Sequence, residues 1–299
     1  MTNIDLHEID TPSKRLWRTF AADWIALFGL IVLSLLVLLA IFAPLVVPQN
    51  PYDLAQLNIL DGRLPPASSS FDEKMFYLLG TDDQGRDIYS AIIFGMRISL
   101  GVGLLSTLGA LVIGTTLGLS AAYMGKKADS LIMRIVDIQL SFPAILTALI
   151  LLAVFGQGLG KIIVALITVQ WAYYARTVRS AALVEMGKEY IEAARCLGLG
   201  HIRIIFHHLL PNCIAPLIVV AAMQIAAAIA LEASLSFLGL GLPITEPSLG
   251  LLISNGYSYL MSGKYWISFY PGLALLVMIV SINLVADRLR DTLNPRLQR

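Results

Sequence analysis

The stretch ISLGVGLLSTLGALVIGTTLGLSAA, residues 98–122, contains no charged side chain. A helix of about 20 mostly apolar residues can cross a bilayer, because it satisfies its own backbone hydrogen bonds where water is absent. Five further stretches are similarly apolar, with Lys161 and Glu232 as their only charged residues, namely residues 24–47, 138–155, 156–175, 213–242 and 267–286. The sequence therefore predicts an all-α membrane protein with six transmembrane helices.

The overall composition agrees with this class. Hydrophobic residues make up 57% of the chain and charged residues 14%, against about 25% charged residues in soluble domains. With 21 Lys and Arg against 20 Asp and Glu, the chain has no broad positive field that would hold nucleic acid. The two cysteines, Cys196 and Cys213, match no zinc spacing. We expect neither a nucleic-acid partner nor a metal site.

Small residues recur at every fourth position of residues 98–122. They are Ser106, Ala110, Gly114, Gly118 and Ala122. This spacing places them along one helix face, and small side chains let two helices approach closely in lipid. The pattern predicts a helix-packing face, and it leaves open whether the partner helix belongs to this chain or to another.

The basic residues divide unequally between the connecting segments. Fifteen of the 21 Lys and Arg lie in the two tails and in the segments after the second and fourth spans, whereas five lie on the opposite side and Arg97 lies at a boundary. Because basic segments stay cytoplasmic, we expect cytoplasmic tails at residues 1–23 and 288–299. Residues 48–96 then form a long outer loop, and residues 97–287 form a five-helix core. The first span, 24–47, exceeds the apolar region of a signal peptide, about 7–15 residues, so we expect it to be retained.

Two acidic features stand out against this apolar background. Asp82, Asp83 and Asp87 in the outer loop do not have calcium-loop spacing, which favours a turn with capping carboxylates. Glu232 is the one acidic residue inside a predicted span. It could line a pathway, pair with Arg97 or a polar backbone site, or lie nearer the outer interface, since an ionisable group in lipid is costly without such a role.

The segment of residues 176–211 is far longer than a membrane hairpin needs. Residues 180–197 predict a helix that ends at Gly198 and Gly200, and residues 202–210 predict a second helix that ends at Pro211. A DNA-binding helix pair does not fit a segment joined to spans at both ends. Adjacent histidines on one helix, His207 and His208, point in different directions and disfavour a metal site. The remaining interpretation of this segment is a pair of surface helices that contacts a soluble partner.

Within this segment lie Glu192-Ala193-Ala194, then Gly198, and then Leu210-Pro211. This pattern resembles the EAA loop of binding-protein-dependent ABC importer permeases, with His208 where the family has isoleucine. Further stretches resemble the "C" subunit of dipeptide and oligopeptide permeases. They are residues 79–87 (LGTDDQGRD), 97–100 (RISL), 235–239 (LSFLG), 271–272 and 283–295.

The resemblance implies the type I ABC importer permease fold in a multi-pass protein of the bacterial inner membrane. The implied partners are a second permease subunit in a heterodimer, two ABC ATPase subunits, a periplasmic substrate-binding protein and membrane lipids. It further implies that Glu192, Ala193, Ala194, Gly198, Leu210 and Pro211 couple the permease to the ATPases, with Ala193 and Ala194 presented to the ATPase. The implied activity is translocation of di- or oligopeptides, without catalysis by this chain.

ATP must then bind elsewhere. A phosphate-binding loop needs the pattern G-x-x-x-x-G-K-[ST], and the nearest candidate, residues 156–161 (GQGLGK), is one residue short and is followed by Ile162. We therefore expect no cofactor on this chain, with ATP and Mg²⁺ on the partner subunits. The alternative function is a stand-alone secondary transporter or channel, against which the absence of an inverted repeat argues.

Overall fold

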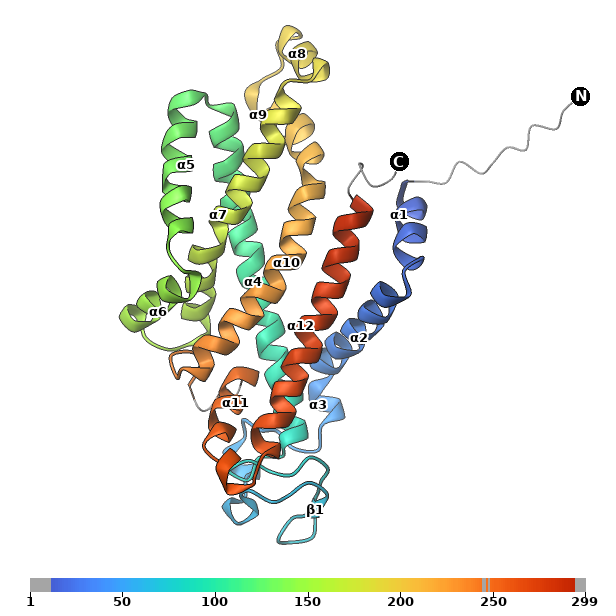
Figure 1. The fold of residues 1–299 in the computed structure, drawn as a ribbon, viewed down its shortest axis with the longest axis vertical. Helices are drawn as coiled ribbons and strands as arrows, with labels where there is room; N and C mark the ends of the chain where they lie inside the picture. Colours follow the sequence, from blue (N-terminus) through green and yellow to red (C-terminus); the bar gives the residue numbers. More distant parts are fainter. Residues whose placement is uncertain (1–11, 244–245, 247, 294–299) are drawn as a thin grey trace, which may run out of the picture.

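The computed structural model describes residues 12–243, 246 and 248–293, and it shows an elongated bundle of helices (Figure 1). Four helical segments are long and apolar enough to cross a membrane: α2 (Trp24–Ile41), α4 (Ile88–Tyr123), α9 to α10 (His201–Phe237) and α12 (Trp266–Leu293). A fifth is present if the bent pair α5 (Lys126–Ser141) and α6 (Ala144–Phe155) counts as one span. By length and composition the described residues thus contain four or five candidate spans.

The predicted span of residues 156–175 corresponds to α7 (Leu159–Met186), which is long enough but more polar. This helix contacts α4, α5, α6 and α10, and Gln170 is buried within it and donates to the carbonyl of Gln224 at 3.1 Å. The buried side-chain N–H of Gln170 thus has its hydrogen-bond partner on the neighbouring helix α10.

The span predicted at residues 138–155 is not one continuous helix. The helix breaks after Ser141, and α5 and α6 meet at an angle of 91°. Phe142 has the extended backbone (φ −92°, ψ 140°) that the residue before a proline prefers, here Pro143. Helix α5 instead lies along α7, where the Arg179 guanidinium binds the Asp129 carboxylate at 2.5 Å.

The ends of several other elements differ from the predicted boundaries. Helix α2 ends at Ile41 and a separate turn, α3 (Ala43–Val46), follows, so residues 24–47 are not one helix. The predicted tail of residues 1–23 contains a helix, α1 (Pro12–Ala21), that contacts α12. Helix α12 continues to Leu293, beyond the predicted end of the core at residue 287. Residues 1–11 and 294–299, with Arg296 and Arg299, lie outside the described residues.

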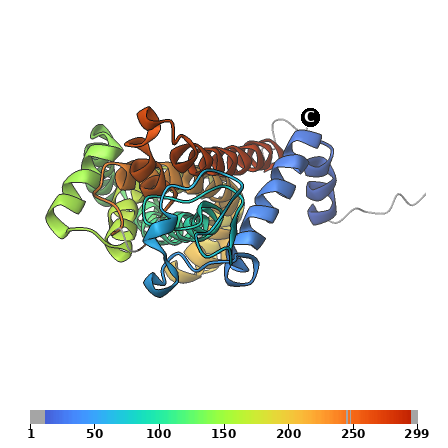
Figure 2. The same ribbon diagram turned by 90° about the horizontal axis from the view of Figure 1, so that it is seen from below.

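The predicted outer loop is shorter than expected, because α4 begins at Ile88. Residues 48–87, here named the polar loop, contain the turns η1 (Leu54–Gln56) and η2 (Ile59–Asp61). They also contain a small antiparallel pair, β1 (Ser68–Ser69) and β2 (Phe76–Tyr77), with Ser68 opposite Tyr77. Figure 2 shows this loop lying across the end of α4.

Buried polar groups hold the polar loop together. Asp82 binds the Nε of Arg86 at 2.7 Å, and both side chains are only 2% exposed. Asp87 caps α4, because its carboxylate accepts the Ser90 backbone N–H at 2.9 Å, which stabilises a helix N-terminus. The carboxylates of Asp82 and Asp87 therefore form a capped turn, as predicted, whereas the Asp83 Oδ1 is buried without a hydrogen-bond partner among the described residues.

The small-residue face of α4 packs on α7 of the same chain. Ser106, Ala110, Gly114, Gly118 and Ala122 are all buried. A Cβ added at Gly114 would lie 2.3 Å from the Trp171 carbonyl oxygen. The backbones of α4 and α7 thus touch where a larger side chain would separate them.

The chain between α7 and α12 contains a second departure from prediction. Residues 202–210 do not form a helix that ends at Pro211. Instead α9 (His201–Arg203) runs through a π-helical turn, η3 (Ile204–Leu209), directly into α10 (Leu210–Phe237). The N–H of Leu210 donates to the Ile205 carbonyl, five residues back, and this wider turn accommodates the proline that follows. Helix α11 (Leu249–Tyr257) and the turn η4 (Leu260–Ser262) lead into α12.

Candidate functional site

The candidate site is the segment between α7 and α10, here named the coupling segment, which lies at the end of the bundle opposite the polar loop (Figure 1). Helix α7 ends at Met186 and α8 (Glu189–Cys196) begins three residues later. The predicted single helix of residues 180–197 is thus two helices, separated at Gly187. Glu185 fastens this turn by accepting hydrogen bonds from the Lys188 ammonium and the Tyr190 hydroxyl, each at 2.6 Å.

The hydroxyl of Tyr190 stays protonated and donates a hydrogen bond in this turn. Burial and the neighbouring Glu185 carboxylate raise the pKa of Tyr190 to about 12. The phenol therefore keeps its proton at neutral pH and remains a hydrogen-bond donor to the Glu185 carboxylate.

Helix α8 turns one face inward and one outward. Ile191 and Ala194 are 0% and 4% exposed and pack against Ile204. Glu192 and Ala193 are exposed on the other face. The expectation that both alanines face a partner is therefore wrong for Ala194, because residues three apart on a helix share a face and Ala194 follows the buried Ile191.

Gly198 closes α8 with a backbone that other residues rarely adopt. Its φ is +72°, its N–H donates to the Arg195 carbonyl at 3.0 Å, and the Leu199 N–H donates to the Ala194 carbonyl at 3.2 Å. These two bonds define a Schellman motif, which favours glycine at this position. No atom lies within 4 Å of a Cβ added at Gly198, so the requirement comes from the backbone conformation and not from space.

The second half of the predicted motif lies at the junction with α10. Leu210 is half-buried, and it packs with Leu209, which is fully buried against α4 and α7. Pro211 is exposed in the first turn of α10. His208, at the position of the family's isoleucine, is half-buried, and its carbonyl accepts the Asn212 side-chain amide at 2.6 Å. These residues join the coupling segment to the bundle and do not form its tip.

Three apolar residues that the sequence analysis did not select form the tip of the coupling segment. Leu197, Ile202 and Phe206 are 79%, 76% and 58% exposed. Leu197 and Ile202 flank the Gly198–Gly200 turn, and large apolar side chains beside a glycine turn are the signal that could have identified them. Large apolar side chains left exposed on one short segment are typical of a surface that binds a partner. These three are named the tip residues below.

The coupling segment is also attached to the end of α4. The Tyr123 hydroxyl and His201 Nδ1 are 2.7 Å apart, and the Arg195 guanidinium lies 5.9 Å from the centre of the Tyr123 ring. Displacement of the segment would therefore be transmitted to α4, the longest helix in the described residues.

Glu232 lies inside the bundle with hydroxyl partners. It is 0% exposed, its Oε2 accepts Ser99 Oγ at 2.9 Å, and its Oε1 accepts Ser236 Oγ at 2.8 Å. A third serine, Ser248 at the start of α11, contributes to its electrostatic surroundings. Of the three roles open from the sequence, this geometry fits a structural partner, although the partners are serines and not Arg97.

Comparisons with known proteins identify the family of this chain. Residues 114–299 match the family described as binding-protein-dependent transport system inner membrane component, and residues 11–66 match the N-terminal TM domain of oligopeptide transport permease C. The di/tripeptide transport system permease protein DppC of Pseudomonas aeruginosa is 38% identical over 96% of this chain and 93% of its own length. The dipeptide transport system permease protein DppC of Escherichia coli K12 is 39% identical over 97% of this chain and 95% of its own length.

Among solved structures, a chain of the inward-facing MetNI methionine ABC transporter superposes with a TM-score of 0.57 at 22% identity. The match covers 69% of this chain and 98% of that chain. A likeness at this identity shows a shared fold. The family match and the near full-length relatives together show that this chain belongs to the binding-protein-dependent transport system inner membrane components, the permease subunits of ABC importers.

Proposed function

We propose that this chain is the "C"-type permease subunit of an ATP-driven importer for di- or oligopeptides delivered by a periplasmic binding protein. The relatives named for dipeptide and di/tripeptide transport cover nearly its whole length. The observation that carries the coupling role is the apolar tip of the coupling segment, which is exposed and is fastened to α4.

We further propose six membrane crossings: α2, α4, the broken α5–α6 pair, α7, α10 and α12. An even number returns the chain to its starting side. In support, α1, the C-terminal end of α12 and the coupling segment lie at one end of the bundle and the polar loop at the other (Figure 1). With basic residues inside, the coupling segment is cytoplasmic, and the polar loop faces the periplasm and the binding protein.

The remaining partners follow from this arrangement. A second permease subunit completes the translocation pathway, and two ABC ATPase subunits carry ATP and Mg²⁺ beneath the membrane. The tip residues insert into a surface of one ATPase, where burial of large apolar side chains supplies the binding free energy. The exposed Glu192 and Ala193 lie beside that contact.

The experiment is co-purification of the ATPase subunits with the assembled transporter. Leu197→Asp and Ile202→Asp each place a charge in the proposed contact, so the two permease subunits should remain paired while ATPase recovery falls. Phe71→Asp is the matched control, because Phe71 is 76% exposed on the polar loop and should not affect recovery. ATPase recovery equal to wild type in both tip variants would refute the coupling role.

The peptide assignment has a separate readout. Uptake of a labelled dipeptide by reconstituted vesicles should require ATP, the ATPase subunits and the binding protein. Uptake by vesicles that contain this chain alone would instead support the alternative, a stand-alone secondary transporter or channel.

A further inference from the structure

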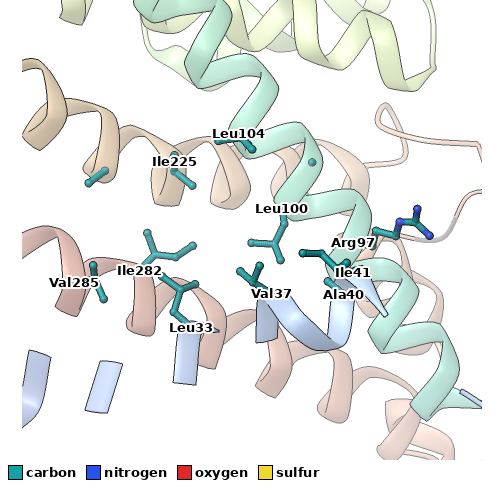
Figure 3. Close-up of a pocket in the computed structure, with 12 residues that line it drawn as sticks. Leu33, Val37, Ala40, Ile41, Arg97, Leu100, Leu104, Ile225, Ile282 and Val285 are labelled. Carbon is teal, nitrogen blue, oxygen red and sulfur yellow. The ribbon is translucent and has the colours of Figure 1, made fainter. Parts of the chain in front are cut away.

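Helices α2, α4, α10 and α12 enclose an apolar groove of about 520 Å³ (Figure 3). Its walls are formed by aliphatic residues such as Leu33, Leu100, Ile225 and Ile282. Arg97 is the single polar side chain among the residues that line it. The groove therefore provides a long apolar surface with a positive charge and no other polar group.

On α2 and α4 the groove lies in the half of each helix nearer the polar loop. On α4 it extends from Arg97 to Leu104, and the seven residue-to-residue steps between them rise roughly 10 Å along the helix. Half of the hydrocarbon core of a bilayer is about 15 Å thick. Ile41, the last residue of α2, lies at the Arg97 end of the groove (Figure 3). This depth matches one leaflet, with Arg97 toward the headgroups.

Arg97 forms no ion pair within the described part of the chain. Arg86, Arg176 and Arg179 each bind an aspartate, whereas no carboxylate of the described residues forms an ion pair with Arg97. Its side chain is exposed, and the guanidinium points away from the apolar side chains of the groove (Figure 3). A basic side chain at a membrane interface with its stem against apolar surface is complementary to an anionic headgroup.

The residues that line the groove distinguish two candidate ligands, a peptide with a carboxylate and a lipid with a phosphate. A peptide has an ammonium group and backbone amides as well as a carboxylate, and each polar group costs free energy when it is buried without a partner. The groove has no acceptor side chain for an ammonium group. An acyl chain requires none, so the charge and the walls together fit a lipid better than the transported peptide.

We propose that the groove binds an acyl chain of an anionic phospholipid from the leaflet on the polar-loop side, with the lipid phosphate held by Arg97. The lipid fills the space between α2 and the rest of the bundle and so fixes the position of α2 against α4 and α12. This inference does not depend on which substrate the transporter carries.

A larger side chain at Gly101 can test whether the groove is occupied and is not expected to disturb the fold. It lines the groove one turn beyond Arg97, and a Cβ added there meets no atom within 4 Å. A leucine at this position would occupy the space of the acyl chain and would not overlap a protein atom at its Cβ. Gly272 in α12 is the matched control, since a Cβ added there also meets nothing within 4 Å and Gly272 does not line the groove.

The test uses the assembled transporter in nanodiscs of phosphatidylethanolamine with a minor fraction of phosphatidylglycerol. Native mass spectrometry after release into detergent measures the phosphatidylglycerol retained by each complex. Arg97→Gln should lower retention about fivefold, the factor for one basic residue at an anionic interface, and Gly101→Leu should lower it at least as much. Arg97→Lys, Gly272→Leu and Lys161→Gln, which removes a charge outside the groove, should retain the wild-type amount.

Several results would overturn the proposal. Unchanged retention in either Arg97→Gln or Gly101→Leu would exclude this lipid site, and low retention in Arg97→Lys would show that charge is not the determinant. A cysteine at Gly101 that cross-links to the second permease subunit would show that a protein helix fills the groove. Loss of peptide uptake in Arg97→Gln with unchanged lipid retention would assign the cation to the substrate pathway.

Discussion

The two ends of α4 have opposite surroundings, buried polar groups at one and exposed apolar side chains at the other. At Ile88 the helix begins under the polar loop, where Asp82 and Arg86 are paired and buried and the Trp266 indole donates to the Thr81 carbonyl at 3.4 Å. At Tyr123 it ends against the coupling segment, whose tip residues are exposed. One end buries a paired aspartate and arginine of the chain itself, whereas the other leaves apolar side chains exposed.

This difference shows how a single helix can serve both structure and coupling. The polar-loop end gains rigidity from the buried Asp82–Arg86 ion pair, which is costly to break. The coupling end gains a binding surface, because its apolar residues are not used in the chain's own core. We expect substitutions at the first end to affect stability and substitutions at the second to affect assembly.

The largest effect should come from the buried ion pair. Arg86→Ala leaves the Asp82 carboxylate buried without its cation, which costs about 3–5 kcal/mol. Thermal unfolding of the purified transporter should show a strongly lowered midpoint or no folded protein. Lys74→Ala is the control, because Lys74 also binds an aspartate but is 81% exposed. An unchanged midpoint in Arg86→Ala would contradict a self-contained polar-loop end.

Between the two ends, the close packing of α4 on α7 can be tested at Gly118. A side chain there would place its Cβ 2.4 Å from the Ala175 carbonyl oxygen, so Gly118→Leu must push α4 and α7 apart. The cost of such overpacking is about 1–3 kcal/mol, and it should appear as a lowered unfolding midpoint. Gly272→Leu has open space around it and should be tolerated; equal loss in both variants would mean that the α4–α7 contact is not tight.

The coupling end is tested by two neighbouring alanines. Ala194 is 4% exposed, so Ala194→Trp should destabilise the coupling segment by about 1–3 kcal/mol and reduce ATPase recovery as a consequence. Ala193 is exposed, so Ala193→Trp should leave the unfolding midpoint unchanged and reduce ATPase recovery by steric overlap with the partner. Measurement of both quantities separates the two causes. The same stability loss in both variants would contradict an outward-facing Ala193.

The smallest effect should come from Glu232→Gln. Glutamine has the same shape, and its amide can accept a hydrogen bond from Ser99 or Ser236, so we expect a loss of about 1 kcal/mol or less and most of the peptide uptake. Glu232→Ala should lower the unfolding midpoint further, because it leaves buried hydroxyls without their acceptor. A loss of uptake in Glu232→Gln with an unchanged midpoint would instead favour a pathway role for the carboxylate.

Features with a local signal were predictable from the sequence. The apolar runs, the capping carboxylates near residue 87 and the glycine turn at residue 198 each depend on residues within one or two helical turns. The positive φ of Gly198 and the cap of α4 by Asp87 follow from such short-range chemistry. The break at Phe142–Pro143 also had a local signal in the proline, which the apolar run obscured.

By itself, the sequence determined that the chain is helical and apolar, where its small-residue face lies, and which family it resembles, because periodicity and motifs are properties of neighbouring residues. Only the tertiary structure decided that this face packs on α7, that Ala194 points inward, that three serines surround Glu232, and that four helices enclose the groove beside Arg97. These contacts join residues far apart in the chain. Their free energies depend on which surfaces meet, and no local pattern encodes that choice.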